Sequence, residues 1–203
     1  MERYLLKKNL TRLIIIEGLW GSGKTTFANY LANKYSLIFI KEPIHRNLFK
    51  ERGISNWYFH QHINRQIQAR NINSKKKVIM ERSIISNAAY QYAKIGCLYR
   101  QYHKILLQFP ELHFSTIVFL YNNSPLLEFK SRQSSNNFKI NQYLSKKFVK
   151  RYIEFYQSVL PKIIKNHPIF LKTKKNGKFL TINNIFTNFK KEYTSLIGNK
   201  KKQ

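Results

Sequence analysis

The sequence contains no aspartate. All of its side-chain carboxylates are therefore glutamates, and any catalytic base or metal-binding carboxylate must be one of nine residues. Acidic residues are few altogether, since these nine stand against 37 lysines and arginines and leave a net charge of +28. The nine are Glu2, Glu17, Glu42, Glu51, Glu81, Glu111, Glu128, Glu154 and Glu192.

Cysteine and long apolar runs are also scarce. Cys97 is the single cysteine, so no internal disulfide can form; we expect it to be a small core side chain in a reducing compartment. The longest apolar runs, such as 13–16 and 117–121, have the length of a strand and are too short to cross a bilayer. Glu17 and Lys24 interrupt the apolar stretch near the N-terminus, and no cleavage site of small residues follows, which argues against a signal peptide. We therefore expect a cytoplasmic protein with no membrane partner.

The excess of positive charge has two explanations. One is binding to nucleic acid. The other, which we favour, is a composition rich in lysine and asparagine, as an AT-rich genome produces. The basic residues are scattered, and the only tight clusters, 75–77 and 200–202, are not interleaved with aromatic residues. In either case the surface should attract anions nonspecifically, including nucleic acid and a polyphosphate substrate.

Strand-like apolar segments alternate with helical patterns along the chain. This alternation predicts an α/β fold in which helices cover both faces of a parallel sheet. We expect residues 1–203 to form one domain with a short lid at about 131–142 and a frayed tail at 198–203. The expected strands are 12–17, 37–40, 78–80, 116–121 and either 168–171 or 179–182. The expected helices are 24–34, 57–70, 84–95, 98–108, 126–131, 142–164 as the longest, and 185–196.

The most specific motif is a glycine-rich turn between the first strand and the first helix. Residues 18–25, Gly-Leu-Trp-Gly-Ser-Gly-Lys-Thr, fit the P-loop pattern G-x-x-x-x-G-K-[ST] in this context. Glycines let the backbone wrap a phosphate, toward which the N–H groups at the start of the helix point. Lys24 should reach the β- and γ-phosphates, and Thr25 should hold Mg²⁺. We therefore expect a P-loop NTPase that binds ATP and Mg²⁺ through Gly18, Gly21, Ser22, Gly23, Lys24, Thr25 and Thr26.

Two glutamates directly follow predicted strands. Glu42 and Glu81 therefore fall at the sheet edge that carries the P-loop, since parallel strands end at one edge. We predict Glu81 as the carboxylate on the Mg²⁺ side, through water, and Glu42 as a catalytic base or substrate-orienting group. Glu17 lies within the end of the first strand, directly before the turn. We expect it to lie too deep to touch a ligand and to have a structural role.

Two arginines are further catalytic candidates. Arg82 follows Glu81 at the same edge, and its planar guanidinium suits phosphate. Arg132 opens the polar loop before a long helix, next to Lys130, so its charge could close over the γ-phosphate. Three histidines at 45, 60 and 62 are expected to be surface residues.

Two segments resemble one group of P-loop kinases. Residues 16–26 resemble the P-loop of thymidylate kinases and deoxynucleoside kinases. Residues 81–91, Glu-Arg-Ser-Ile-Ile-Ser-Asn-Ala-Ala-Tyr-Gln, are similar to the thymidylate kinase segment D-R-Y-x-x-S-x-x-A-Y-Q, but they open in the deoxynucleoside kinase form. Two further matches follow the family's order. Asn64-Arg65 is similar to the segment with the substrate-binding arginine of thymidylate kinases, and Ser124-Pro125 followed by Arg132 resembles the start of the family's lid. The resemblance covers nearly the whole chain and implies an Mg-ATP kinase for nucleosides or their monophosphates. Kinases of this group are commonly homodimers.

The resemblance also implies roles for single residues. Arg82 would hold the acceptor phosphate or the transferred phosphate, and Arg65 would hold the acceptor phosphate or lie over the base. Tyr90 and Gln91 would line the base pocket.

Other segments resemble deoxynucleoside kinases more closely. Thymidylate kinases usually carry Arg-Glu-Pro-Gly-Gly-Thr where this chain has Lys41-Glu42-Pro43-Ile44-His45-Arg46. This run is more similar to the Glu-Pro-Val of deoxynucleoside kinases, in which the glutamate is the base for the 5′-hydroxyl. Residues 57–61 resemble their segment in which an aromatic residue and a glutamine, here Gln61, read the base. Trp20 stands where thymidylate kinases usually carry an acidic residue, and indole can only donate. The lid is also sparse in arginine for a monophosphate kinase.

The two acceptors require different chemistry. A hydroxyl benefits from a base such as Glu42, whereas an anionic monophosphate needs cations such as Arg46, Arg65 and Arg82. We predict a nucleoside monophosphate kinase, with thymidylate (dTMP to dTDP) first, because the match at 86–91 is the longer one. The alternatives are a deoxynucleoside kinase, a basic P-loop protein that binds nucleic acid, and a kinase homologue that has lost activity.

Overall fold

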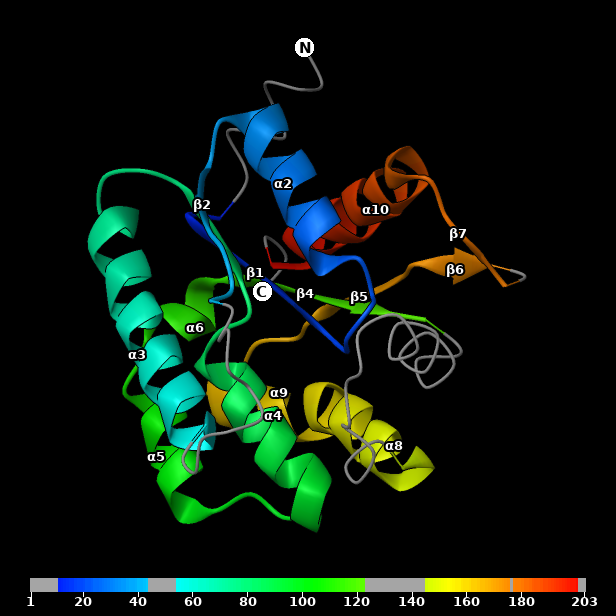
Figure 1. Ribbon diagram of the computed structural model, residues 1–203. Coiled ribbons are helices and arrows are strands. Elements are labelled where there is room, and N and C mark those ends of the chain that lie inside the picture. Colours follow the sequence, from blue (N-terminus) through cyan, green and yellow to red (C-terminus); the bar gives the residue numbers. More distant parts are fainter. Residues whose placement is uncertain (1–10, 44–53, 123–144, 176, 201–203) are drawn as a thin grey trace.

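The computed structural model describes residues 11–43, 54–122, 145–175 and 177–200 (Figure 1). Its main feature is a parallel sheet of five strands in the order β2-β3-β1-β4-β5. The predicted α/β fold is thus confirmed. The strands are β1 (Leu13–Gly18), β2 (Ile38–Ile40), β3 (Val78–Glu81), β4 (Thr116–Tyr121) and β5 (Ile169–Lys172).

Helices cover both faces of this sheet. In Figure 1, α2 and α10 lie over one face, whereas α3, α4, α8 and α9 lie over the other. The helices are α2 (Lys24–Tyr35), α3 (Ile54–Asn73), α4 (Ile84–Ile95), α5 (Arg100–Leu107), α6 (Glu111–Phe114), α8 (Lys146–Glu154), η1 (Phe155–Val159), α9 (Leu160–Ile164) and α10 (Ile182–Lys200).

The central strand β1 is buried on both faces, as its unbroken apolar run predicts. Alternate side chains enter opposite cores because successive residues of a strand point to opposite faces. Leu13 and Ile15 pack in the core under α4 and α9, and Ile14 and Ile16 in the core under α2 and α10. Both ends of β1 are therefore fixed, and the turn that follows it has a rigid base.

The helix expected at 142–164 differs most from the prediction. From Lys146 onward it consists of α8, a π-helical turn η1 and α9. Pro161, near the start of α9, lacks an N–H, so the regular α-helical ladder cannot run unbroken through this segment. Among the described helices, α3 is longer, with 20 residues.

The end of the chain settles the choice of the last strand. Residues 169–172 form β5, while β6 (Lys174–Lys175) and β7 (Lys178–Phe179) pair in a small antiparallel ribbon. The alternative at 179–182 is wrong, because α10 begins at Ile182 and continues to Lys200. The helix expected at 126–131 and the lid at 131–142 lie outside the described residues.

Cys97 is exposed rather than a core side chain, so that prediction is wrong. It follows Gly96, which ends α4 at a φ of 90°, and so lies in the connection to α5. Within the described ranges, no helix is both long and apolar enough to cross a bilayer.

Candidate active site

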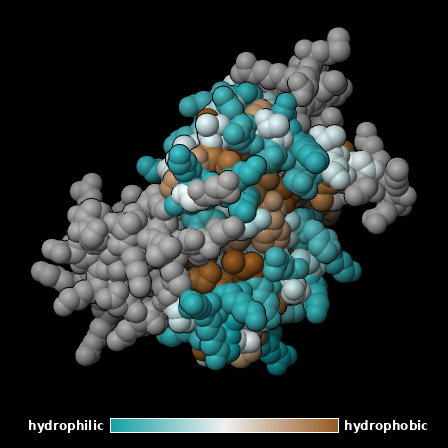
Figure 2. All heavy atoms as spheres, turned by 90° about the vertical axis from the view of Figure 1, so that its right-hand side faces the viewer, coloured by the Kyte–Doolittle hydropathy of each residue, from teal (hydrophilic) through white to brown (hydrophobic). Residues whose placement is uncertain are grey.

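The carboxyl ends of β1, β2 and β3 bring the predicted site residues together. β1 runs into the P-loop, Glu42 follows β2, and Glu81 ends β3. The strands end level with one another, since Ile16 lies opposite Glu81 and Ile40 lies opposite Met80. Figure 2 shows the face at the right of Figure 1, toward which β4 points; hydrophobic side chains gather there between hydrophilic regions.

Two glycines of the P-loop are required by its geometry. Gly18 has a φ of 139°, and a Cβ at this position would lie 2.2 Å from the carbonyl oxygen of Leu120 on β4. Gly23 has a φ of 84° and is the N-cap of α2. Both conformations are disfavoured for residues with a side chain, which explains these two positions of the motif.

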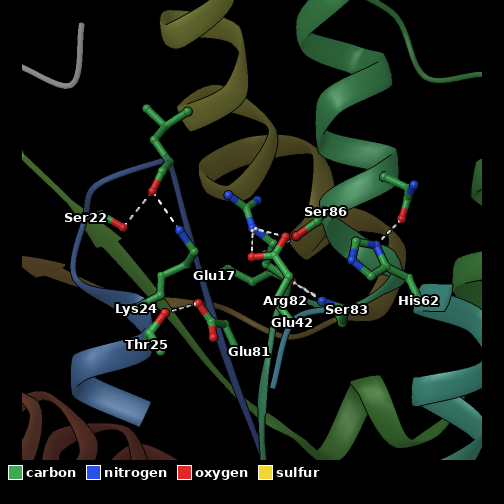
Figure 3. Close-up of polar contacts among 12 residues, drawn as sticks. Glu17, Ser22, Lys24, Thr25, Glu42, His62, Glu81, Arg82, Ser83 and Ser86 are labelled. Carbon is green, nitrogen blue, oxygen red and sulfur yellow. Dashed lines mark hydrogen bonds and ion pairs between the residues drawn. The ribbon is translucent and has the colours of Figure 1, made fainter. Parts of the chain in front are cut away.

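The Lys24 ammonium group is held over the loop. Lys24 Nζ and Ser22 Oγ each donate to the Leu19 carbonyl oxygen at 2.8 Å (Figure 3). Burial, and then the charge of Arg82, lower the pKa of Lys24 to about 7, against the opposing effect of nearby glutamates. Because a neighbouring anion favours the ammonium form, a bound phosphate would raise this pKa again.

Thr25 and Glu81 meet across the start of α2 and the end of β3. Thr25 Oγ1 donates to Glu81 Oε1 at 2.6 Å (Figure 3). A hydroxyl beside a carboxylate fits Mg²⁺, which prefers oxygen ligands and keeps several waters. No group of three or more His, Cys, Asp or Glu side chains suited to a metal occurs among the described residues. The pair therefore fits a magnesium ion that is also held by phosphate oxygens.

Glu42 and Arg82 form an ion pair. Arg82 Nε lies 2.9 Å from both carboxylate oxygens of Glu42. Arg82 also donates from Nη1 to the Tyr152 hydroxyl at 3.3 Å, and its guanidinium carbon lies 5.5 Å from the centre of the Trp20 ring. Burial lowers the pKa of Arg82, but the charges of Glu42, Tyr152, Glu17 and Tyr156 together outweigh this effect, and the pKa lies above its ordinary value.

Arg65, from α3, reaches the ends of the strands that carry the two glutamates. Its Nη2 donates to the carbonyl oxygens of Ile40 at 3.1 Å and Glu81 at 2.5 Å. Burial lowers its pKa to about 10. Its Nε and Nη1 are buried and have no hydrogen-bond partner within the described part of the chain.

His62 is a site residue that the sequence analysis missed. It is only 3% exposed, and its Nδ1 pairs with Oδ1 of Asn87 on α4 (Figure 3). Burial lowers its pKa to about 4, so the ring is neutral at physiological pH. Nε2 is buried without a hydrogen-bond partner among the residues described. His60 is exposed, as expected, and His45 lies outside the described residues.

No apolar spacing in α3 could have identified His62, because its buried neighbours on the same helix face are mostly polar. Together with Arg65, Gln66 and Ala69 it forms an i, i+3, i+4, i+7 series, and all four side chains are buried. Gln61, the residue predicted to read the base, is half-buried one position earlier.

A family model matches most of the chain. The model described as "Deoxynucleoside kinase" matches residues 14–198. The chain belongs to the deoxynucleoside kinase family. It is therefore a nucleoside or nucleotide kinase whose phosphate donor is ATP or another nucleoside triphosphate. The comparison with curated proteins gave no match.

Solved structures of other proteins share the fold. Thymidylate kinase from Ehrlichia chaffeensis has a TM-score of 0.58 at 19% identity, over 88% of this chain and 96% of that chain. Deoxyadenosine kinase from M. mycoides with bound dCTP has a TM-score of 0.57 at 18% identity, over 90% and 99%. YorR from Bacillus subtilis, in complex with phosphorylated GDP, has a TM-score of 0.51 at 17% identity, over 90% and 98%.

Not every predicted site residue joins the cluster in this family member. Both polar groups of Gln91 are engaged in the connection after α4: Nε2 donates to the Cys97 carbonyl oxygen at 2.9 Å, and Oε1 accepts from the Tyr99 amide at 3.0 Å. These bonds do not involve P-loop residues, and the place of Gln91 in the base pocket stays a prediction. Arg132 lies outside the described residues.

Tyr90, in contrast, does lie beside the P-loop. Its ring packs edge-on against Trp20 and Phe148, with ring centroids 6.2 and 5.2 Å apart. Trp20 also stacks on Phe148 at 6.5 Å. Within this aromatic group, Trp20 stands at the P-loop position where thymidylate kinases usually carry an acidic residue.

Proposed function

We propose that the protein is a deoxynucleoside kinase that transfers the γ-phosphate of Mg-ATP to the 5′-hydroxyl of a deoxynucleoside. The observation that carries this proposal is the ion pair between Glu42 and Arg82 beside the P-loop. The family match supports the same acceptor. Thymidylate, the acceptor favoured by the sequence, has less support, since the structural likeness to a thymidylate kinase at 19% identity reflects the fold alone.

Glu42 would act as the base. The guanidinium of Arg82 favours the ionised carboxylate, which then accepts the proton of the 5′-hydroxyl as that oxygen attacks the γ-phosphorus. The bond between the γ-phosphorus and the bridging oxygen breaks, leaving ADP and a nucleoside 5′-monophosphate, and Glu42 releases the proton to water. An acceptor phosphate at this position would instead be repelled by the carboxylate.

Lys24 and Arg82 would stabilise negative charge on the phosphate during transfer, since transfer depends mainly on positioning and charge. Thr25 and Glu81 would hold Mg²⁺, directly or through water. When bound, Mg²⁺ neutralises the phosphate oxygens.

The pair of His62 and Asn87 would contact the base. With Nδ1 donating to the Asn87 carbonyl oxygen, Nε2 of the neutral ring is an acceptor. A buried acceptor without a partner is costly, and an N–H or amino group of a base would satisfy it.

A monophosphate acceptor remains the second candidate because of Arg65. Two of its guanidinium nitrogens are buried without a partner among the described residues and could bind an acceptor phosphate. In that case Arg65→Lys would raise the KM for a monophosphate acceptor while leaving the KM for ATP unchanged.

The test is ADP production from Mg-ATP with deoxynucleosides and their monophosphates as acceptors. We expect turnover with at least one deoxynucleoside. Lys24→Ala serves as the blank, because it removes the ammonium group while leaving the rest of the chain intact. Turnover with monophosphates alone would contradict the proposal and favour the second candidate.

A further inference from the structure

Arg82 has an unusual backbone conformation for its position. Its φ is 56°, in the left-handed region that residues with a side chain rarely adopt. The other non-glycine residues with positive φ in the described ranges, Ser36 and Lys165, both follow the last residue of a helix, where this conformation is common. Arg82 instead lies between a strand and the N-cap of a helix, so its conformation must be imposed by its surroundings.

Hydrogen bonds to β1 constrain the backbone at Arg82 and at the residue after it. The Arg82 amide donates to the Ile16 carbonyl oxygen at 3.0 Å. The next amide, that of Ser83, donates to the side chain of Glu17 at 3.0 Å, and Ser83 Oγ donates to the same oxygen at 2.8 Å. Ser83 Oγ also accepts from the Ile85 amide and so caps α4.

The second carboxylate oxygen of Glu17 extends this network to two helices. It accepts hydrogen bonds from Ser86 Oγ in the first turn of α4 and from the Tyr156 hydroxyl of η1, the latter at 2.9 Å (Figure 3 shows the Glu17, Ser83 and Ser86 contacts). Glu17 has no exposed surface. Burial raises its pKa, while the hydroxyl donors and the charge of Arg82 oppose the rise. Such a saturated, buried carboxylate has no oxygen left for a substrate.

The direction of the Arg82 side chain follows from this backbone. Its guanidinium lies between Glu42, Tyr152 and Trp20, and the residue as a whole is 6% exposed. A helical or extended φ at Arg82 would turn the side chain away from Glu42, since φ and ψ set the direction of the Cα–Cβ bond.

We propose that Glu17 is a positioning residue for phosphoryl transfer: by fixing the Ser83 cap it holds Arg82 in the left-handed conformation that aims its guanidinium at Glu42 and the transferred phosphate. The proposal rests on the proposed kinase function. It goes beyond the role of Glu17 as a buried structural residue, because it predicts an effect on the chemical step that exceeds any effect on folding.

Two substitutions at Glu17 separate these roles. Glu17→Ala removes all four hydrogen bonds, and kcat should fall about 10- to 100-fold, while the KM for ATP changes little. Glu17→Gln keeps an acceptor for Ser83, and its amide can donate to the Ser86 or Tyr156 hydroxyl, so most of kcat should be retained. Should Glu17→Ala fail to fold, the double variant Ser86→Ala/Tyr156→Phe removes both hydroxyl donors from one oxygen and should lower kcat in the same direction.

The matched control is Glu111→Gln. Glu111 accepts from Gln66 and pairs with Arg70 at 2.9 Å, away from the P-loop. It should lower stability but leave kcat unchanged. A folded Glu17→Ala variant with kcat within about twofold of the wild type would overturn the proposal.

A second readout does not need turnover. The Arg82 Nε–H, which donates to Glu42, should give a ¹⁵N–¹H side-chain signal protected from exchange, assigned by its loss in Arg82→Lys. In Glu17→Ala this signal should shift and lose protection. If no nucleoside is phosphorylated but the signal responds in this way, the proposed kinase function fails, while the inference that Glu17 holds the conformation of Arg82 stands. If turnover is normal and the signal is unchanged, the inference fails alone.

Discussion

Three glutamates near the P-loop differ in exposure and in partners, and these differences separate their proposed roles. Glu17 is fully buried and receives only hydroxyl and amide donors. Glu81 is buried beside the hydroxyl of Thr25, and Glu42 is the more accessible partner of Arg82. In a chain without aspartate, one residue type would thus serve as structural acceptor, metal-side ligand and base.

Glu81→Gln tests the metal site. The amide keeps the size of the side chain but loses the charge that attracts Mg²⁺, so we expect the Mg²⁺ concentration for half-maximal turnover to rise at least tenfold. Titration of Mg²⁺ at constant ATP measures this value. Glu154→Gln, which changes a carboxylate bonded to Tyr92 on the surface, is the control and should leave the titration unchanged.

His62 makes the stability of the fold depend on pH. Its folded pKa is about 4, below its ordinary value near 6.5, so the unfolded chain binds a proton between these values that the folded chain does not. Stability should therefore be full above about pH 6.5 and fall towards pH 4, by at most about 3 kcal/mol. The groups near the ring are Asn87, Arg65, Glu42 and Arg82.

Urea unfolding at a series of pH values measures this dependence. His62→Gln should remove it, whereas His60→Gln, which changes an exposed ring on the same helix, should preserve it. A wild-type curve parallel to that of His62→Gln between pH 4 and 6.5 would contradict the burial of a neutral His62.

At the scale of elements, the sequence predicts the position of a helix, strand or motif well wherever the pattern lies within that segment alone. α4 and β4 begin and end where their apolar patterns do, and the P-loop lies in its expected strand–turn–helix context. The same holds for Glu42 and Glu81, which lie at the carboxyl ends of β2 and β3, the edge at which open parallel sheets bind ligands.

Features that depend on tertiary contacts could not be predicted in this way. The π-turn of η1 and the burial of His62 are set by packing against other elements, and α3 carries little amphipathic pattern beyond its buried 62–69 stripe. The place of Gln91 in the base pocket stays a prediction, because a motif fixes a position in sequence but not the direction of the side chain, and both polar groups of Gln91 bond in the connection after α4. Cys97 is exposed because it follows the end of α4.

The helix α2, which follows the P-loop, packs against α10 on one face of the sheet. Phe189 is fully buried, and its ring lies 5.8 Å from that of Phe27. Phe189→Ala should lower the free energy of unfolding by about 3–5 kcal/mol, since it leaves a cavity. Phe114→Ala, at a residue that is 77% exposed, should change it by less than about 0.5 kcal/mol. Equal losses in denaturant unfolding would contradict this core.

At the scale of the whole molecule, a net charge of +28 should guide anionic substrates. We expect kcat/KM for ATP to fall several-fold as ionic strength rises from about 0.01 to about 0.15 M, because the Debye length shortens from about 30 to about 8 Å. The KM for an uncharged deoxynucleoside should stay constant. Steady-state kinetics at both salt concentrations measure this, and a salt-independent value for ATP would assign the charge no role in substrate encounter.

The most direct test of the account is kcat of Glu42→Gln with the preferred deoxynucleoside and Mg-ATP. The glutamine can still accept a hydrogen bond from Arg82, so the site should keep its shape and its affinity for ATP while losing its base. We predict that kcat falls about 10²- to 10⁴-fold with unchanged ATP binding. A kcat within a few-fold of the wild type would contradict the role of Glu42 as the base and with it the hydroxyl acceptor.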